Sequence, residues 1–343
     1  MASENLADMK AYQLTAMTGR DALRLVELPE PKPPRGQLLV RVRATSLNYR
    51  DLLVSDGRYG KLNLPLIPLS DGAGEIAAVG EGVTGWKTGD RVAGTFFQGW
   101  PSGPFQREMA NTALGGALNG MLAEYVALSA DGVVAIPSHL NFEEAATLPC
   151  AALTAWQALV FRGNISADET VLLLGTGGVS IFALQFAKMH GARVIITSGS
   201  DEKLARAKTL GADETINYLS TPDWEKEVFR LTGEAGVDQV VEVGGTGTFV
   251  KSLRSVKPGG QVHLVGGVSG FTADVPLTEI IRKLVVVRGI YVGSHGMFAA
   301  MNRAITLHRT KPVVDRVFKF VEAAAAYQFL QSGKHFGKVV ISI

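Results

Sequence analysis

A glycine-rich turn after a short apolar run is the segment of this sequence with the clearest chemical meaning. Residues 171–174 are all aliphatic, and residues 175–178 read Gly-Thr-Gly-Gly before an amphipathic stretch begins. Glycines allow the chain to reverse sharply and a pyrophosphate to approach the backbone, and the following helix N-terminus supplies amide donors and a favourable dipole. Ser180 replaces the third glycine of the usual dinucleotide fingerprint, so a plain strand-turn-helix connection is the alternative. The expected contacts of a dinucleotide at this turn are Gly175, Gly177, Gly178 and Val179.

The end of the next apolar run indicates which dinucleotide the turn would take. NAD-specific sites usually place an acidic residue about 20 residues after the turn, where it binds the ribose hydroxyls. This chain has Ser198 at that position, followed by Ser200 and Lys203. Small hydroxyl donors beside a lysine can receive a phosphate dianion, which a carboxylate would repel. The pattern favours NADPH over NADH; the alternative is that Lys203 is a solvated helix residue and Asp201 only an N-cap.

Cysteine and histidine usage argues against a metal site. Cys150 is the single cysteine, which excludes an internal disulfide and any site built from several thiolates. The six histidines are dispersed, with no pair at helix-face spacing. The sequence therefore predicts no metal.

Composition predicts an ordinary globular protein. Hydrophobic residues make up 46% and charged residues 19% of 343 residues, a length that suits two domains. A formal net charge of +2, from scattered lysines and arginines, does not suggest a nucleic-acid partner. The sequence contains no run of about 18 apolar residues, so no membrane-spanning helix is expected. The first ten residues carry Glu4 and Asp8 and lack an apolar core, so no secretory signal is expected and the cytoplasm is the expected location.

The pattern of apolar residues changes near residue 141. The first part is rich in short strands, predicted at residues 37–44, 72–82, 123–128 and 132–136. Beyond it, helical stretches alternate with apolar strands predicted at 171–174, 193–197, 215–217, 237–243 and 261–265. Such alternation predicts right-handed βαβ units and a parallel sheet, hence an α/β protein. A strand-like run at 284–292, helices at 295–309 and 322–332 and a strand at 337–343 close the sequence.

Several motifs along nearly the whole chain resemble one family. They are Ser46-Leu47-Asn48-Tyr49-Arg50-Asp51, Asp71-Gly72-Ala73-Gly74-Glu75-Ile76, Gly89-Asp90-Arg91-Val92, Ala123-Glu124-Tyr125 and Leu153-Thr154-Ala155-Trp156. Together with the glycine turn, they resemble the medium-chain dehydrogenase/reductase superfamily, in particular its zinc-free, quinone oxidoreductase-like branch. The resemblance implies a GroES-like β-rich catalytic domain (residues 1–140, completed by 291–343) and a Rossmann domain with a doubly wound parallel sheet (residues 141–290).

The resemblance also shows where zinc ligands would stand. By register on Asp51, Asn48 occupies the first ligand position of zinc-dependent members, Ser70 the second and Cys150 the third. A catalytic zinc needs three protein ligands, and a structural zinc lobe needs four cysteines, whereas residues 94–120 contain none. We therefore expect no zinc.

Without zinc, hydrogen-bond donors must stabilise the substrate oxygen when a hydride arrives. Asn48, Tyr49 and Tyr59 are the candidate donors, and Asp51 is a candidate supporting acceptor. A purely structural role is the alternative for three of these residues: Asn48 would bond the backbone of a loop, Tyr49 would only pack, and Asp51 would cap a turn.

Cofactor contacts follow from the resemblance at four places in the chain. Thr154 is implied near the diphosphate and nicotinamide, and Lys203 and Tyr218 at the 2′-phosphate of the adenosine. Residues at strand ends facing the nicotinamide, and two near the C-terminus, complete the set: Gly244, Val265, Gly266, Gly267, Tyr291, Val292, Phe336 and Lys338.

The leading functional hypothesis is a zinc-independent, NADPH-dependent reductase of quinones or α,β-unsaturated carbonyls. One alternative is alcohol dehydrogenase or aldehyde and ketone reductase activity, and another is a non-enzymatic NADPH-binding structural or regulatory protein. The expected partners are a small-molecule substrate and a second copy of the chain, paired through the run at 284–292, with no nucleic acid and no membrane.

Overall fold

The computed structural model describes residues 8–343, and it divides the chain into two compact units. One comprises the chain up to Leu153 together with Gly293–Ile343, and the other is Thr154–Val292. The expectation about the first ten residues falls mostly on residues 1–7, which lie outside the described part. Between residues 8 and 343 no helix is both long and apolar enough to cross a bilayer.

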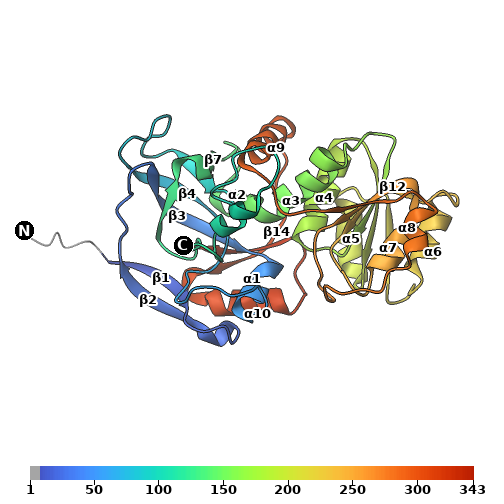
Figure 1. The fold of residues 1–343 in the computed structure, drawn as a ribbon, viewed down its shortest axis with the longest axis horizontal. Coiled ribbons are helices and arrows are strands. Elements are labelled where there is room, and N and C mark those ends of the chain that lie inside the picture. The colour runs from blue at the N-terminus through green and yellow to red at the C-terminus, as the bar shows by residue number, and fades with distance from the viewer. Residues whose placement is uncertain (1–7) are drawn as a thin grey trace, which may run out of the picture. The chain divides into compact units, whose positions relative to one another are not determined.

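The first unit is built on an antiparallel sheet with one parallel pair at its edge (Figure 1). The strand order is β14-β15-β3-β4-β5-β7, and β6 also pairs with β3. The strands are β3 (Gln37–Leu47), β4 (Asp71–Val79), β5 (Arg91–Gly94), β6 (Tyr125–Ser129), β7 (Val133–Ala135), β14 (Val314–Lys319) and β15 (Lys338–Ser342). A separate hairpin joins β1 (Asp8–Leu14) to β2 (Leu23–Pro29). This unit confirms the expected β-rich domain.

Short helices cover this sheet. They are α1 (Tyr49–Ser55), α2 (Phe142–Ala145), α9 (His295–His308) and α10 (Ala323–Gln331), with 3-10 turns η1 (Arg20–Ala22), η2 (Arg107–Thr112), η3 (Ala130–Gly132) and η6 (Phe320–Glu322). The buried side chains of α10 recur at helical spacing (Ala323, Ala326, Tyr327, Leu330), so one face packs against the sheet.

The boundary between the units lies later in the sequence than expected. The helix α2 packs on β3 and β4, and the π-helical segment η4 (Leu148–Ala152) contacts β4 and β5. Both therefore belong to the first unit, and the expected boundary after residue 140 moves to the start of α3 (Leu153–Trp156). A second π-helical segment, η5 (Gln157–Arg162), follows in the second unit.

The second unit is a six-stranded sheet in which every neighbouring pair is parallel. The order is β10-β9-β8-β11-β12-β13, a doubly wound Rossmann sheet as expected. The strands are β8 (Thr170–Leu174), β9 (Arg193–Ser198), β10 (Glu214–Asn217), β11 (Val237–Glu242), β12 (Val256–Leu264) and β13 (Val286–Gly289). The apolar residues of β8 are buried because helices cover both faces of such a sheet.

The helices of this unit lie against the parallel sheet. They are α4 (Gly178–Met189), α5 (Asp201–Thr209), α6 (Trp224–Leu231), α7 (Phe249–Ser255) and α8 (Leu277–Ile281). Contacts of α6 and α8 with α7 place these three side by side (Figure 1). The strand expected at 284–292 is shorter, because Leu284 adopts a left-handed conformation (φ 54°) and β13 begins only at Val286.

A buried histidine on one strand of this sheet makes the free energy of unfolding depend on pH. His263, on β12, has its Nε2 atom 2.8 Å from Gln239 Oε1, and Gln239 Nε2 donates to Glu169 Oε2 at 2.6 Å. Burial, with a smaller contribution from the Arg288 charge, lowers the pKa of His263 from 6.5 to about 4. The unfolded chain therefore takes up a proton between pH 6.5 and 4 that the folded chain does not.

Replacing this histidine should flatten the acid limb of the stability curve. The contribution of His263 is complete above pH 6.5 and is lost as the pH falls towards 4, by up to about 3 kcal/mol. His263→Gln keeps a donor for Gln239 and cannot titrate. Urea unfolding at pH 7, 5 and 4 should show the variant losing less stability than the wild type, and the exposed control His308→Gln behaving as the wild type. Parallel curves for His263→Gln and the wild type would contradict this account.

Candidate functional site

The glycine turn has the geometry of a phosphate-binding loop. Gly175 adopts φ 70°, and the space where a Cβ atom would project is open. Gly177 is the N-cap of α4 and has no side chain to cover the first amide groups of the helix. The Ser180 hydroxyl donates to the Leu174 carbonyl oxygen at 2.7 Å, so the residue that departs from the fingerprint closes the turn from inside. Backbone amides at this turn can therefore receive a pyrophosphate.

Ser198 and Ser200 form a pair of hydroxyls after β9. Ser198 Oγ accepts a hydrogen bond from the Ser200 backbone N–H, and Ser200 Oγ accepts one from the Lys203 N–H, both at 3.3 Å. Each hydroxyl proton can therefore donate to a phosphate oxygen. A Cβ atom at Gly199 would lie only 2.9 Å from Tyr218 Oη, so glycine is needed there for Tyr218 to approach. These predicted contacts lie together where β9 and β10 end.

The acidic residue beside these hydroxyls has a structural partner. Asp201 Oδ1 accepts from Asn217 Nδ2 at 2.6 Å, which joins the start of α5 to the end of β10. The N-cap of α5 is Ser200, so the alternative role of Asp201 as N-cap is wrong. Lys203 lies in the first turn of α5.

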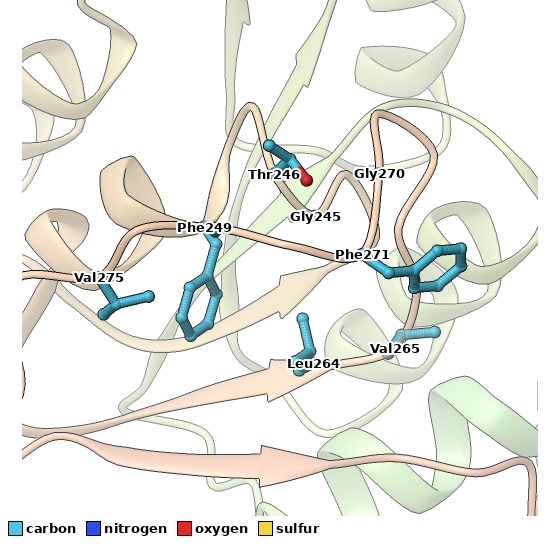
Figure 2. Close-up of a pocket in the computed structure, with 10 residues that line it drawn as sticks. Gly245, Thr246, Phe249, Leu264, Val265, Gly270, Phe271 and Val275 are labelled. Atoms are coloured by element: carbon cyan, nitrogen blue, oxygen red, sulfur yellow. The ribbon is translucent and has the colours of Figure 1, made fainter.

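A pocket of about 400 Å³ opens beside the ends of β11 and β12 (Figure 2). Two predicted cofactor contacts, Val265 and Gly266, line it, and Phe249 and Phe271 make it largely apolar. Gly267 packs closely, since a Cβ atom there would lie 2.5 Å from the Gly270 carbonyl oxygen. This part of the site is a preformed apolar surface.

The loop beside this pocket is held by Glu242, a residue that the sequence analysis missed. Its Oε1 accepts from the backbone N–H of Gly244 (2.7 Å) and Gly245 (2.9 Å) and from Thr248 Oγ1 (2.6 Å). Its other oxygen accepts from Ser252 Oγ. An acidic residue at the end of an apolar strand, directly before a glycine-rich turn, is the signal that could have identified it.

The remaining predicted cofactor residues fall at several places. Thr154 is buried in α3, and Tyr291 and Val292 follow β13, where the backbone N–H of Tyr291 donates to Gln157 Oε1 at 3.1 Å. Phe336 is buried in the first unit, two residues before β15.

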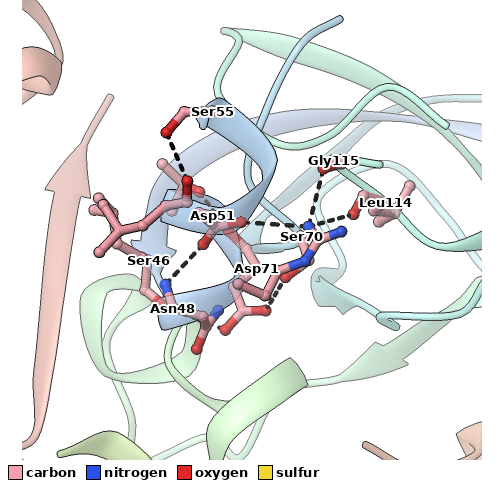
Figure 3. A network of polar contacts seen from close by, with 12 residues as sticks. Ser46, Asn48, Asp51, Ser55, Ser70, Asp71, Leu114 and Gly115 are labelled. Atoms are coloured by element: carbon pink, nitrogen blue, oxygen red, sulfur yellow. Dashed lines mark hydrogen bonds and ion pairs between the residues drawn. The ribbon is translucent and has the colours of Figure 1, made fainter. Parts of the chain in front are cut away.

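The first unit contains a buried polar network around the start of α1 (Figure 3). Asn48 is the N-cap of α1, and Asp51 Oδ2 accepts from its backbone N–H at 2.7 Å. Burial raises the pKa of Asp51 to about 6, although the charge of Arg50 opposes the shift. Asp51 therefore has the capping role that the sequence offered as its structural alternative.

Arg50 ties this helix to the segment between residues 94 and 120. Its Nη1 atom donates to the carbonyl oxygens of Leu114 and Gly115, at 3.0 Å each. Its guanidinium lies over the ring of Tyr59, 4.6 Å from the centroid. Tyr59 is thus a packing partner of Arg50, and Tyr49 packs half-buried against the core. Arg50 was not among the site residues predicted from the sequence.

The side chains of Asn48, Ser70 and Cys150, at the positions where zinc-dependent members carry ligands, do not suit zinc. The Lys338 ammonium lies 2.6 Å from Asn48 Oδ1, so a second cation there would be repelled. Ser70 Oγ donates to Asp71 Oδ1 at 2.8 Å, and burial raises the pKa of the Cys150 thiol, which favours the protonated form. Zinc binds thiolates rather than thiols. Within residues 8–343, no group of three or more His, Cys, Asp or Glu side chains could hold a metal ion.

Comparison with known proteins identifies the family. Models of the alcohol dehydrogenase GroES-like domain and of a zinc-binding dehydrogenase match residues 34–138 and 178–307. A zinc-type alcohol dehydrogenase-like protein of Schizosaccharomyces pombe is 44% identical over 92% of this chain and 93% of its own length. A solved NAD-dependent alcohol dehydrogenase is 37% identical (TM-score 0.90; 98% of this chain, 100% of that chain). A 2-octenoyl-CoA carboxylase reductase, solved with NADP and 2-octenoyl-CoA, is 27% identical (TM-score 0.87; 98% and 87%).

These matches span both units and agree with the fold described above. The chain belongs to the medium-chain dehydrogenase/reductase superfamily, with a GroES-like domain and a Rossmann domain, and it is an oxidoreductase of that family.

Proposed function

We propose that this chain is a zinc-independent, NADPH-dependent oxidoreductase that transfers a hydride to a quinone or an α,β-unsaturated carbonyl. The observation that carries the proposal is the orientation of the Asn48 amide. Its Oδ1 accepts from Lys338 Nζ, and its Nδ2 is buried without a hydrogen-bond partner. A buried N–H donor without a partner costs about 1–3 kcal/mol, which an arriving carbonyl oxygen would recover.

The Asn48 amide suits the chemistry of carbonyl reduction. As a hydride reaches a conjugated carbonyl, negative charge develops on the oxygen, and a preorganised N–H donor binds that charge more strongly than it binds the neutral substrate. A neutral amide does this work without a metal ion. Asp51 and Arg50 support the donor by capping and anchoring α1.

The residues of the parallel-sheet unit fit a dinucleotide that carries a 2′-phosphate. When bound, the nicotinamide supplies the hydride. The amides of the glycine turn would hold the pyrophosphate, and Ser198, Ser200, Lys203 and Tyr218 would hold the 2′-phosphate. The relative solved with NADP and an enoyl-CoA supports both the cofactor and the substrate class. Thr154 and the residues after β11, β12 and β13 remain proposed contacts, and a cytoplasmic location remains a prediction.

Alcohol dehydrogenase activity is the second candidate, favoured by the similarity to an NAD-dependent alcohol dehydrogenase. One experiment separates the two. Purified protein is assayed with NADPH and NADH against quinones, enones and enoyl thioesters, and with NADP⁺ and NAD⁺ against simple alcohols. The proposal expects NADPH oxidation by a quinone or a conjugated carbonyl. Turnover restricted to alcohols would favour the second candidate, and tight NADPH binding without any turnover would favour a non-enzymatic protein.

We also propose that two copies pair through β13. This strand forms one edge of the parallel sheet, and Val286 and Val287 are partly exposed on it while Leu284, just before it, is 75% exposed. An edge with unpaired backbone groups and apolar side chains favours pairing with a second strand, and a second copy offers the same edge.

Light scattering should therefore give the mass of a dimer for the wild type. Val287→Lys places a charge in the expected interface and should shift the mass towards a monomer. Leu307→Lys, on an apolar side chain of α9 that is 79% exposed, serves as the matched control and should leave the dimer intact. A monomeric wild type would contradict the proposed pairing.

A further inference from the structure

Lys338 is a buried lysine at the first position of β15. Its Nζ atom lies 2.7 Å from the Leu47 carbonyl oxygen, 2.6 Å from Asn48 Oδ1 and 3.7 Å from Asp71 Oδ2. The strand register explains this position, because Val339 pairs with Leu47 and Lys338 therefore lies beside the end of β3. An ammonium has three protons to donate and no lone pair. Two of its protons donate to Leu47 O and Asn48 Oδ1, and the Asp71 carboxylate pairs with its charge at a distance too long for a hydrogen bond.

The contact with Lys338 determines which way the Asn48 amide points. Because Lys338 Nζ can only donate, it must face Oδ1, and Nδ2 is turned away without a partner. Without the ammonium, the amide could rotate and exchange its oxygen and nitrogen ends, since such terminal torsions are broad. The neighbouring positive charge also polarises the amide and strengthens Nδ2 as a donor.

Asp71 is the counter-ion that allows a charged lysine in this buried place. It is fully buried at the start of β4, and it accepts from Ser70 Oγ (2.8 Å) and Ser46 Oγ (3.2 Å). A buried charge is tolerated when it is paired and hydrogen-bonded. The sheet of the first unit thus supplies every part of the arrangement that orients Asn48.

We infer that Lys338 is a positioning residue that acts on the substrate oxygen through the Asn48 amide. The inference rests on the proposed function, which makes Asn48 Nδ2 the donor. It differs from the cofactor contact that the family resemblance implies for Lys338, because the ammonium already donates to Leu47 and Asn48 and its charge is paired with Asp71.

A double-mutant cycle in kcat tests this role. The wild type, Asn48→Ala, Lys338→Met and the double variant are assayed as full chains with NADPH and the preferred substrate of the panel. Lys338→Met should lower kcat on the order of 100-fold, as expected for a displaced catalytic donor, while the Kd for NADPH changes little. The double variant should lose no more than Asn48→Ala alone, because Lys338 acts only through that amide.

Two outcomes would overturn the inference. One is a loss in kcat in the double variant that equals the product of the losses in the two single variants. The other is a raised Kd for NADPH with a nearly normal kcat in Lys338→Met. The wild type and Asn48→Ala separate the possible failures. If the wild type shows no NADPH-dependent turnover with any quinone or conjugated carbonyl, the proposed function fails. If the wild type is active and Asn48→Ala keeps its kcat, the donor role of Asn48 and this inference fail together; if Asn48→Ala is impaired and the losses multiply, only the role of Lys338 fails.

A charge-balanced variant guards against misfolding. Lys338→Met leaves Asp71 buried and unpaired, which can destabilise the fold severely. Asp71→Asn combined with Lys338→Met removes both charges and should show the same loss in kcat with an unchanged Kd for NADPH. Wild-type kcat in this neutral pair would contradict the inference.

Discussion

Asn48→Ala is expected to lower kcat by about 100-fold to 1000-fold, the effect of removing one preorganised donor to a developing oxyanion. The Kd for NADPH should change little, because the predicted contacts with the pyrophosphate and the 2′-phosphate lie in the other unit. Single-turnover measurement of NADPH oxidation at saturating substrate would separate the hydride-transfer step from binding and product release.

Asn48→Asp is the matched variant for this prediction. An aspartate keeps an oxygen beside Lys338 Nζ and a capping group at the start of α1. It replaces the Nδ2 donor with a carboxylate oxygen whose negative charge repels the developing oxyanion. We expect a loss in kcat at least as large as that of Asn48→Ala. A wild-type kcat in Asn48→Asp would show that Nδ2 does not act on the substrate.

The second large effect is expected for Ser198→Asp, which should weaken NADPH binding on the order of 100-fold. The substitution removes a hydroxyl donor and places a carboxylate where the 2′-phosphate is expected. NADH should bind as well as before or better, because a carboxylate at this position accepts from the ribose hydroxyls. The Kd values for NADPH and NADH, measured by the fluorescence of the reduced cofactor, give the ratio directly.

Thr209→Asp is the control for net charge. It adds the same charge at the last residue of α5, the end remote from Ser198, and the side chain there is exposed. The preference between NADPH and NADH should not change in this variant. An equal change in both variants would mean that long-range charge, rather than contact at Ser198, decides the preference.

Local sequence signals predicted the fold well. The glycine turn after β8, the hydroxyls after β9 and the alternation of strands and helices each depend on residues a few positions apart. The boundary between the units was predicted less well, because α2 and the π-helical segment η4 are assigned by their packing on β3, β4 and β5 rather than by their own sequence.

Most side-chain contacts of the buried network in the first unit could not be predicted from the sequence. Lys338 contacts Asn48 across 290 positions, and Arg50 contacts Leu114 and Gly115 across 64 and 65. Such contacts depend on strand register and loop packing, which a single sequence does not reveal. Asn48 was identified because it occupies the position of the first zinc ligand in zinc-dependent members of the family. The orientation of its amide follows from the contact with Lys338, which the sequence did not predict.

The most direct test of the central claim is the rate of NADPH oxidation by metal-depleted protein. The protein is dialysed against a chelator, its zinc content is measured by elemental analysis, and the rate is recorded with the preferred quinone or conjugated carbonyl. We expect an unchanged rate at substoichiometric zinc and no increase when Zn²⁺ is added. A rate that is lost on depletion and restored by one zinc ion per chain would contradict the account.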